Sequence, residues 1–312
     1  MTAEKSAPPG AGPSVAAGTP ASSAALFVLF AGAAFSTASP LARWARPAHP
    51  LSVAFGRLAV AALVLLVLDR GALLPAVRAL TARQRATVFA AGALLAAHFA
   101  AFLWGLDHTS LPAAVSLVSL EPLGVVLSAW GLLGVVPTRP ERLGVGLATA
   151  GAIVVAQGAG TGEHRLVGDL VVVVSVALFG LYLTVARALK DALPARSYAA
   201  LVYTGASLVL ALALAAAPAA FAGPAWPPEP HSLVAVAALG LIPTVLGHTA
   251  VQTASRTLPP AIVALVSPAE TLGGIAIGAA MLGAVPSAAE LLGAAIIVAG
   301  SALAIVGPRA GG

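Results

Sequence analysis

Two glutamates stand where a membrane-spanning chain seldom places a charge. Glu121 lies near the middle of one apolar run and Glu270 near the middle of another. An ionisable side chain at that depth of a bilayer costs roughly 2.5–3.5 kcal/mol on insertion scales. Pro122 follows Glu121 and Pro268 precedes Glu270, and a proline disturbs the backbone one turn earlier. A carboxyl at a kinked helix can contact an ion or a solute; the alternative is a protonated carboxyl that holds helices together.

Two histidines also lie within apolar runs. His248 shares a predicted helical face with Thr244 and Gln252, at spacings of minus four and plus four. Such a polar stripe must face protein or water, because lipid cannot satisfy it. An imidazole there could relay protons or bind a solute. His98 is expected to be a hydrogen-bonded packing residue, although the same chemistry is open to it.

Three further side chains complete the predicted solute or proton pathway. Arg57 lies about two turns into the second apolar run, and we expect it to snorkel towards the headgroups unless it faces a cavity. Tyr182 and Tyr203 are candidates for lining a cavity, although aromatic residues near helix ends are more often interface anchors. No catalytic residue, metal site or cofactor is predicted.

The composition shows what kind of structure must hold these residues. Hydrophobic residues make up 59% of the 312 residues, charged residues only 9%, and the mean hydropathy is +0.98. A soluble domain carries near 25% charged residues, so lipid must be the solvent for most of the exterior. The net charge of +5 comes from single or paired basic residues between apolar runs, a pattern that does not point to nucleic acid. The absence of cysteine excludes disulfides and thiolate metal sites.

The apolar runs predict an all-α integral membrane protein with ten transmembrane helices. The runs cover Ala24–Trp44, Leu51–Leu68, Ala86–Leu106, Pro112–Leu133, Leu143–Gln157, Leu166–Ala186, Tyr198–Ala217, Leu233–Thr253, Ala261–Leu282 and Leu291–Val306. The first run is too long for a signal peptide. The expected organisation is a disordered tail at 1–23, a first repeat at 24–158, a second repeat at 166–307 and a C-terminal tail at 308–312.

The second half of the chain repeats the first. At a shift of 149 residues Glu121 falls on Glu270 and Gly134 on Gly283. The same shift pairs Gly124 with Gly273, Pro137 with Pro286, Glu141 with Glu290, Leu143-Gly144 with Leu292-Gly293, and Gly151 with Gly300. Ten spans therefore divide into five plus five. Because five is odd, the second copy enters the membrane from the opposite side, which gives the inverted repeat common in secondary transporters.

Basic residues set the expected orientation. With a cytoplasmic N-terminus, twelve of the 16 lysine and arginine residues lie inside and Arg57 lies within a span. The three outside are Arg43, Arg46 and Arg165. This bias predicts a protein of the cytoplasmic membrane with both termini in the cytoplasm.

Several short motifs resemble the EamA family of the drug/metabolite transporter (DMT) superfamily. Those of the first repeat are Ala96-Ala97-His98-Phe99, Leu120-Glu121-Pro122, Leu133-Gly134, Glu141-Arg142-Leu143-Gly144 and Ala150-Gly151. Those of the second are Leu246-Gly247-His248-Thr249, Leu258-Pro259, Glu270, Leu292-Gly293 and Ala299-Gly300. The chain departs from the family in reading Glu270-Thr271 where Glu-Pro is frequent. The resemblance implies two EamA repeats and a ten-helix exporter or permease for small metabolites.

Together these features predict a secondary transporter that moves a small polar metabolite, such as an amino acid, by alternating access. A proton gradient or the membrane potential would supply the energy. The expected partners are the solute and the bilayer, and a homodimer is left open. The alternative is a polytopic membrane enzyme acting on a lipid-linked substrate. It ranks lower because the loops are short and no His-Glu-x-x-His or Gly-x-Ser-x-Gly motif stands in a span.

Overall fold

The computed structural model describes residues 21–160, 162–187, 189, 192–216, 229–254 and 266–306, and the structural statements below concern these residues. They are helical, with no strand among them. The first half holds α1 (Ala21–Ser36), α2 (Ala38–Trp44), α3 (Pro50–Ala79), α4 (Ala82–Asp107), α5 (Leu111–Val118), α6 (Glu121–Leu133) and α7 (Arg139–Ala156). The second half holds α8 (Leu166–Arg187), α9 (Ala195–Ala216), α10 (Pro230–Leu239), the π-helix η2 (Gly240–His248), α11 (Thr249–Ala254), α13 (Val266–Leu282) and α14 (Ala288–Val306).

The expected tails fall almost wholly outside these residues. Residues 1–20 and 307–312 are not described, whereas residues 21–23, expected in the N-terminal tail, already belong to α1.

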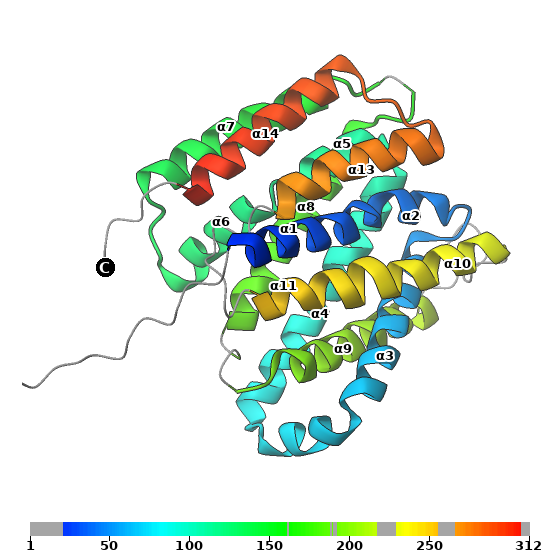
Figure 1. Ribbon diagram of the computed structural model, residues 1–312, viewed down its shortest axis with the longest axis vertical. Coiled ribbons are helices and arrows are strands. Elements are labelled where there is room, and N and C mark those ends of the chain that lie inside the picture. Colours follow the sequence, from blue (N-terminus) through cyan, green and yellow to red (C-terminus); the bar gives the residue numbers. More distant parts are fainter. Residues whose placement is uncertain are drawn as a thin grey trace, which may run out of the picture.

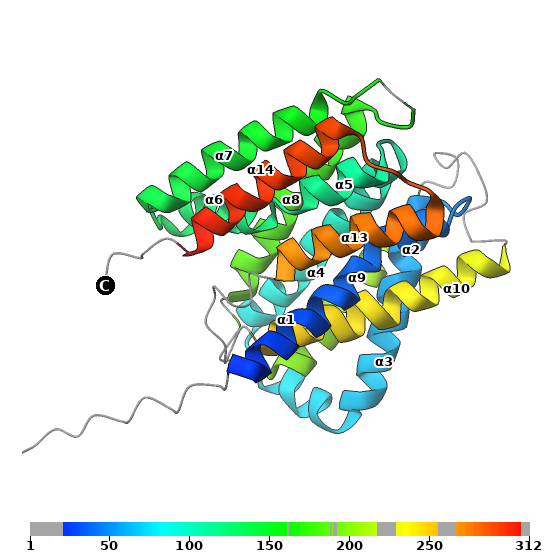
Figure 2. The same ribbon diagram turned by 45° about the horizontal axis from the view of Figure 1, so that its top comes forward.

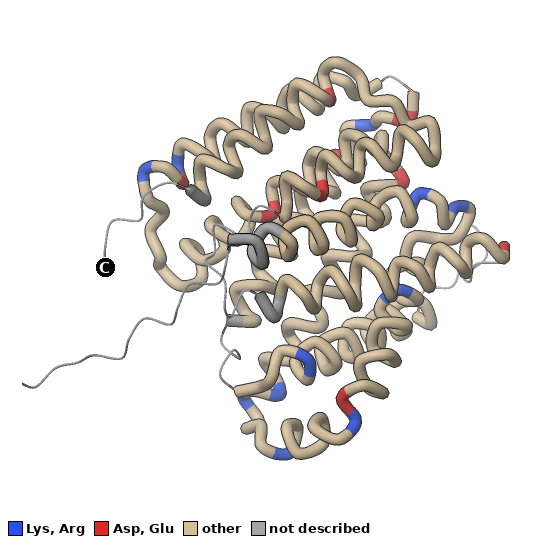
Figure 3. The backbone as a smooth tube through the Cα atoms, viewed as in Figure 1, with Lys and Arg blue, Asp and Glu red and all other residues tan. Residues whose placement is uncertain are grey.

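Six helical segments are long and apolar enough to cross a membrane. They are Leu26–Trp44, Pro50–Ala79, Ala82–Asp107, Leu166–Ala186, Ala195–Ala216 and Pro230–Val251. The pair α5 and α6, bent by 42°, becomes a seventh if it is one span. The helices α13 and α14 are shorter apolar helices, and α7 carries three charged residues in its first turn. The structure therefore confirms a multi-span helical membrane protein but not the number ten. Figure 3 shows that most charged residues lie towards helix ends.

The two halves are interleaved rather than side by side. Helix α7 packs along α14, and α3 packs along α9 (Figures 1 and 2). The contact of α4 with α8 is mirrored by that of η2 with α1, and the contact of α6 with α8 by that of α13 with α1. This pairing of equivalent contacts is what a two-fold relation between the repeats produces, and it places the centre of the molecule between them.

Matching helix ends support the same relation. Gly134 ends α6 and Gly283 follows α13, with φ of 68° and 65°, a left-handed conformation that favours glycine. After each glycine the next helix begins with the same reciprocal cap, made by Thr138 with Glu141 in α7 and by Ser287 with Glu290 in α14. All of these positions coincide at the 149-residue shift.

Close packing of α7 on α14 depends on glycine, which leads to a testable expectation. A Cβ at Gly151 would lie 2.8 Å from the Ile297 nitrogen and 2.9 Å from the Gly293 oxygen, whereas one at Gly146 meets nothing within 4 Å. We expect Gly151→Leu to destabilise the protein by about 1–3 kcal/mol, the usual cost of overpacking. The midpoint of thermal unfolding in detergent measures the effect. Gly146→Leu is the matched control, and an equal fall in both variants would contradict the packing argument.

Candidate functional site

Arg57 is buried in the centre of the bundle. Its side chain on α3 is 1% exposed, and its Nε and one terminal nitrogen donate to the Thr244 hydroxyl at 3.2 and 3.0 Å. The guanidinium also lies 4.1 Å from the centroid of the Phe99 ring on α4, a cation–π contact. The expectation that Arg57 snorkels is therefore wrong. The arginine faces protein because α3 turns this side towards α4 and the π-helix.

Thr244 is positioned by an irregular helix. It lies in η2, is fully buried, and donates to the Leu239 carbonyl five residues earlier at 2.7 Å. Pro243 lies inside the same element, and a π-helical turn of this kind is frequent at functional sites. Because that donation commits the hydroxyl proton, the oxygen is left to accept from Arg57. Thr244 and His248, which were expected to share one face of an α-helix, therefore both lie in a π-helix.

Glu121 and Glu270 come from equivalent positions of the two repeats. Glu121 begins α6, directly after the 42° bend from α5, so the predicted kink is present. Glu270 lies in the second turn of α13, which begins at Val266. Both side chains are half-buried, and their carboxyls interact electrostatically. One carboxyl from each repeat therefore lies within electrostatic range of the other.

Glu270 also interacts electrostatically with Arg57. Among the described residues, however, no direct ion pair joins Arg57 to a carboxylate. A buried guanidinium whose hydrogen bonds go to a neutral hydroxyl is incompletely compensated. Among the described residues, the charge of Arg57 is therefore balanced only at a distance, through Glu270.

The two histidines border the same centre. Nδ1 of His98 lies 2.8 Å from the Ser175 carbonyl oxygen on α8, which agrees with the hydrogen-bonded packing role expected for it. The His248 ring lies 4.8, 6.0 and 6.1 Å from the rings of Phe35, Phe99 and Phe179. The two histidines interact electrostatically with each other. Aromatic rings thus pack against both imidazoles.

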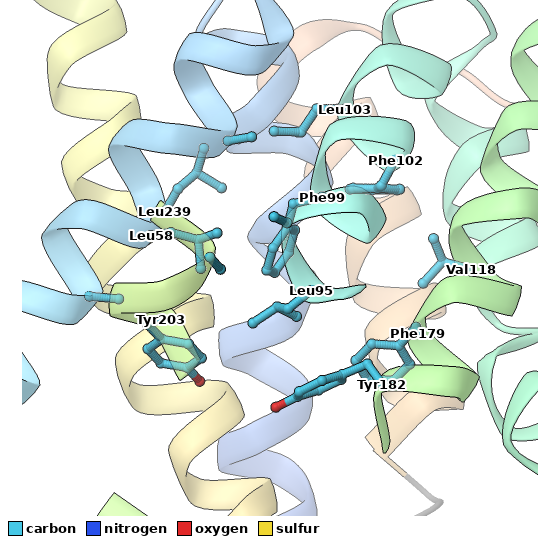
Figure 4. Packing of buried hydrophobic residues seen from close by; sticks show 14 of the residues in the cluster. Leu58, Leu95, Phe99, Phe102, Leu103, Val118, Phe179, Tyr182, Tyr203 and Leu239 are labelled. Carbon is cyan, nitrogen blue, oxygen red and sulfur yellow. The ribbon is translucent and has the colours of Figure 1, made fainter. Parts of the chain in front are cut away.

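Both predicted tyrosines lie inside the bundle rather than at an interface. Tyr182 on α8 and Tyr203 on α9 are each 1% exposed. Figure 4 shows their hydroxyl ends turned towards one another below Leu95, and the two side chains interact electrostatically. Their role as membrane anchors is therefore excluded. The side chain of Gln252 lies outside the described residues.

Sequence reasoning missed the aromatic wall of this centre. Phe35, Phe99 and Phe179 come from three helices far apart in the chain and converge around the histidines. The one signal for any of them was the position of Phe99 next to His98. We call Arg57, Thr244, Glu121, Glu270, His98 and His248 the central cluster. Among the described residues, no group of three His, Cys, Asp or Glu could hold a metal ion.

Comparisons with known proteins agree with this architecture. The model of the EamA-like transporter family matches the chain twice, over residues 22–157 and 166–306. A solved structure titled "Crystal structure of protein" aligns with a TM-score of 0.65 at 19% sequence identity, covering 91% of this chain and 96% of its own. At that identity the likeness concerns the fold alone. No curated protein sequence matches the chain.

Proposed function

Because this chain belongs to the EamA-like transporter family, we propose that it is a secondary transporter carrying a small polar metabolite, such as an amino acid, across the cytoplasmic membrane by alternating access. The observation that carries the proposal is the central cluster. It combines a buried cation with one carboxyl from each repeat, between interleaved repeats that pack as two equivalent halves. Secondary transporters place their solute and ion sites at such a repeat interface.

The cluster suggests how a solute would be held. The Arg57 guanidinium would bind a carboxylate, for which its planar donors are well suited. Phe99 stacks against one face of the guanidinium and Thr244 orients it. Glu270 and Glu121 would receive a positive group of the solute or a proton. A small zwitterion satisfies both ends of this arrangement.

The alternative of a polytopic enzyme acting on a lipid-linked substrate is not favoured. Members of the matched family are transporters. Arg57, Thr244 and His98 of the central cluster are buried on helices rather than placed in a loop at a membrane face. A lipid-linked substrate would need such a loop to reach its headgroup.

The test is transport by the purified full-length protein in liposomes. We expect at least one radiolabelled solute from a panel of amino acids, small amines and small carboxylic acids to move faster than in protein-free liposomes. The movement should depend on an imposed proton gradient or membrane potential. If every solute of the panel leaks at the protein-free rate under all gradients, the proposal for this class of solute fails.

The proposed topology has ten spans and both termini in the cytoplasm. The six apolar segments and the bent pair would be seven of these spans. Helices α7, α13 and α14, which pack against them in the bundle, would be the other three. Reporter fusions should be external after Pro50, Glu163 and Pro230, and cytoplasmic after Arg83, Arg139 and Lys190, because of the basic bias. An odd number of spans would contradict both the topology and the inverted repeat.

A further inference from the structure

A second buried polar cluster lies away from the centre, where the two repeats are joined. His164, in the connection from α7 to α8, is 2% exposed. Its Nε2 lies 2.8 Å from an Asp169 oxygen and its Nδ1 lies 3.4 Å from a Glu290 oxygen. Asp169 belongs to the first turn of α8 and Glu290 to the first turn of α14, and they are 3% and 4% exposed. One imidazole therefore bridges two buried carboxyls on different helices.

The turn between α4 and α5 completes this cluster. The Thr109 hydroxyl donates to Asp169 at 2.6 Å, and the Ser110 hydroxyl donates to Glu290. Thr109 and Ser110 belong to the first repeat, whereas Asp169 and Glu290 belong to the second. The cluster thus ties the repeats together at one end of the bundle.

Charged residues ring the cluster nearer to the surface. Arg43 pairs with Glu163 and donates to the Thr109 carbonyl at 2.7 Å. Arg46 pairs with Asp107 at 3.0 Å and with Glu163 at 3.2 Å. These bonds hold the end of α2 and the α7–α8 connection against the same α4–α5 turn.

We propose that His164, Asp169 and Glu290, with Thr109 and Ser110, form a latch that holds this end of the bundle closed and must open for a solute to pass there. On the proposed topology this is the outer end. The inference rests on the proposed transport function, because it assigns the latch to one side of the path to the central cluster.

The chemistry of the latch explains how it can be both firm and reversible. One ring nitrogen of His164 is hydrogen-bonded to Asp169 and the other lies beside Glu290, so a single imidazole contacts a carboxyl from each of two helices. Removing one partner of such a buried pair leaves the other uncompensated, which is costly. When the helix ends separate, water can solvate the same groups. The latch therefore stabilises the closed state strongly only while all of its side chains are in contact.

The repeat supplies a matched control within the chain. Glu141 occupies the position equivalent to Glu290 and forms the same reciprocal helix cap with Thr138. Among the described residues, however, Glu141 forms no hydrogen bond or ion pair with the other repeat. Replacing Glu141 therefore tests the loss of a cap, whereas replacing Glu290 tests the loss of a cap and the latch.

Thiol accessibility in this cysteine-free chain tests the latch without a known solute. Ser116→Cys places a reporter on α5, at a fully buried position between one and two turns beyond Ser110. The full-length protein in liposomes is treated with a membrane-impermeant maleimide. We expect His164→Gln and Glu290→Gln each to raise the labelling rate at least about tenfold, a factor that corresponds to about 1.4 kcal/mol. Glu141→Gln should leave the rate unchanged.

A milder variant guards against simple misfolding. Thr109→Val keeps the shape of the side chain and removes the hydroxyl that donates to Asp169, so it should raise the labelling rate by a smaller factor. Elution as a single species and a thermal midpoint close to that of Glu141→Gln identify variants that remain folded. If folded Thr109→Val, His164→Gln and Glu290→Gln all label at the Glu141→Gln rate, the cluster is structural and the latch is refuted. Faster labelling without transport of any panel solute would uphold the latch and refute the proposed solute class.

Discussion

Replacing both Glu121 and Glu270 with glutamine is expected to abolish gradient-driven transport while the protein still folds. The two carboxyls come from equivalent positions of the two repeats and interact electrostatically. When two carboxyls interact strongly, proton binding to one depends on whether the other carries a proton. Proton uptake by the pair would change the charge beside Arg57 and so favour one open state over the other. Glutamine keeps the size of the side chain but cannot take part in this exchange.

The single variants should differ. We expect Glu121→Gln to lose gradient-driven transport and keep solute exchange, because its Glu-Pro pair begins α6 directly after the bend. We expect a smaller loss for Glu270→Gln, which lies inside α13 without a following proline. The measurement is the initial rate of transport after a pH jump in liposomes, with Glu141→Gln as a control outside the central cluster. Wild-type, gradient-dependent rates in the double variant would leave the carboxyls a structural role, and coupling would have to move to His248 or be dropped.

Arg57→Gln is expected to weaken binding of a carboxylate-bearing solute by about thirtyfold or more. That factor corresponds to about 2 kcal/mol, the lower end of the cost of removing one member of a buried charged pair. The arginine is 1% exposed, and its side-chain hydrogen bonds go to Thr244 through Nε and one terminal nitrogen. Its remaining N–H groups could donate to a solute carboxylate, and little water would compete for them. The concentration of solute at half-maximal transport rate measures the effect.

Two companion variants separate charge from geometry at this position. Arg57→Lys keeps a cation without the planar fork and should recover part of the lost affinity. Thr244→Val removes the hydroxyl that orients the guanidinium and should have a smaller effect than Arg57→Gln. A solute without a carboxylate should lose little affinity in any of the three. Equal affinity of wild type and Arg57→Gln for every carboxylate in the panel would remove Arg57 from the binding site.

Much of the architecture could be predicted because the lipid environment leaves strong signals in a sequence. Long apolar runs and basic residues placed mostly between them follow from the bilayer, and the repeat at a 149-residue shift follows from internal duplication. Pro122 beside Glu121 likewise predicted a break that the structure has between α5 and α6. The number of spans is less well defined, because α7 begins with a charged turn and the described parts of α13 and α14 are short.

The direction in which a side chain points could not be predicted for Arg57. An arginine two turns inside a span can reach the headgroups, as we expected, or the bundle interior, and the choice depends on which helix packs beside it. Here the guanidinium lies over the Phe99 ring and donates a hydrogen bond to Thr244, and these two residues come from other helices. No residue pattern in the sequence indicated the π-helical turn that positions Thr244.

By itself, therefore, the sequence determined the solvent of this protein, its helical class, its internal repeat and the family that it resembles. These properties depend on composition and on the order of residues along the chain, because the apolar or polar character of each segment decides whether lipid can surround it. Only the tertiary structure decided that Arg57, Glu121, Glu270 and the two histidines share one centre, and that His164 bridges Asp169 and Glu290. Such meetings depend on the packing of helices from both repeats, and packing is set by side chains that are far apart in the sequence.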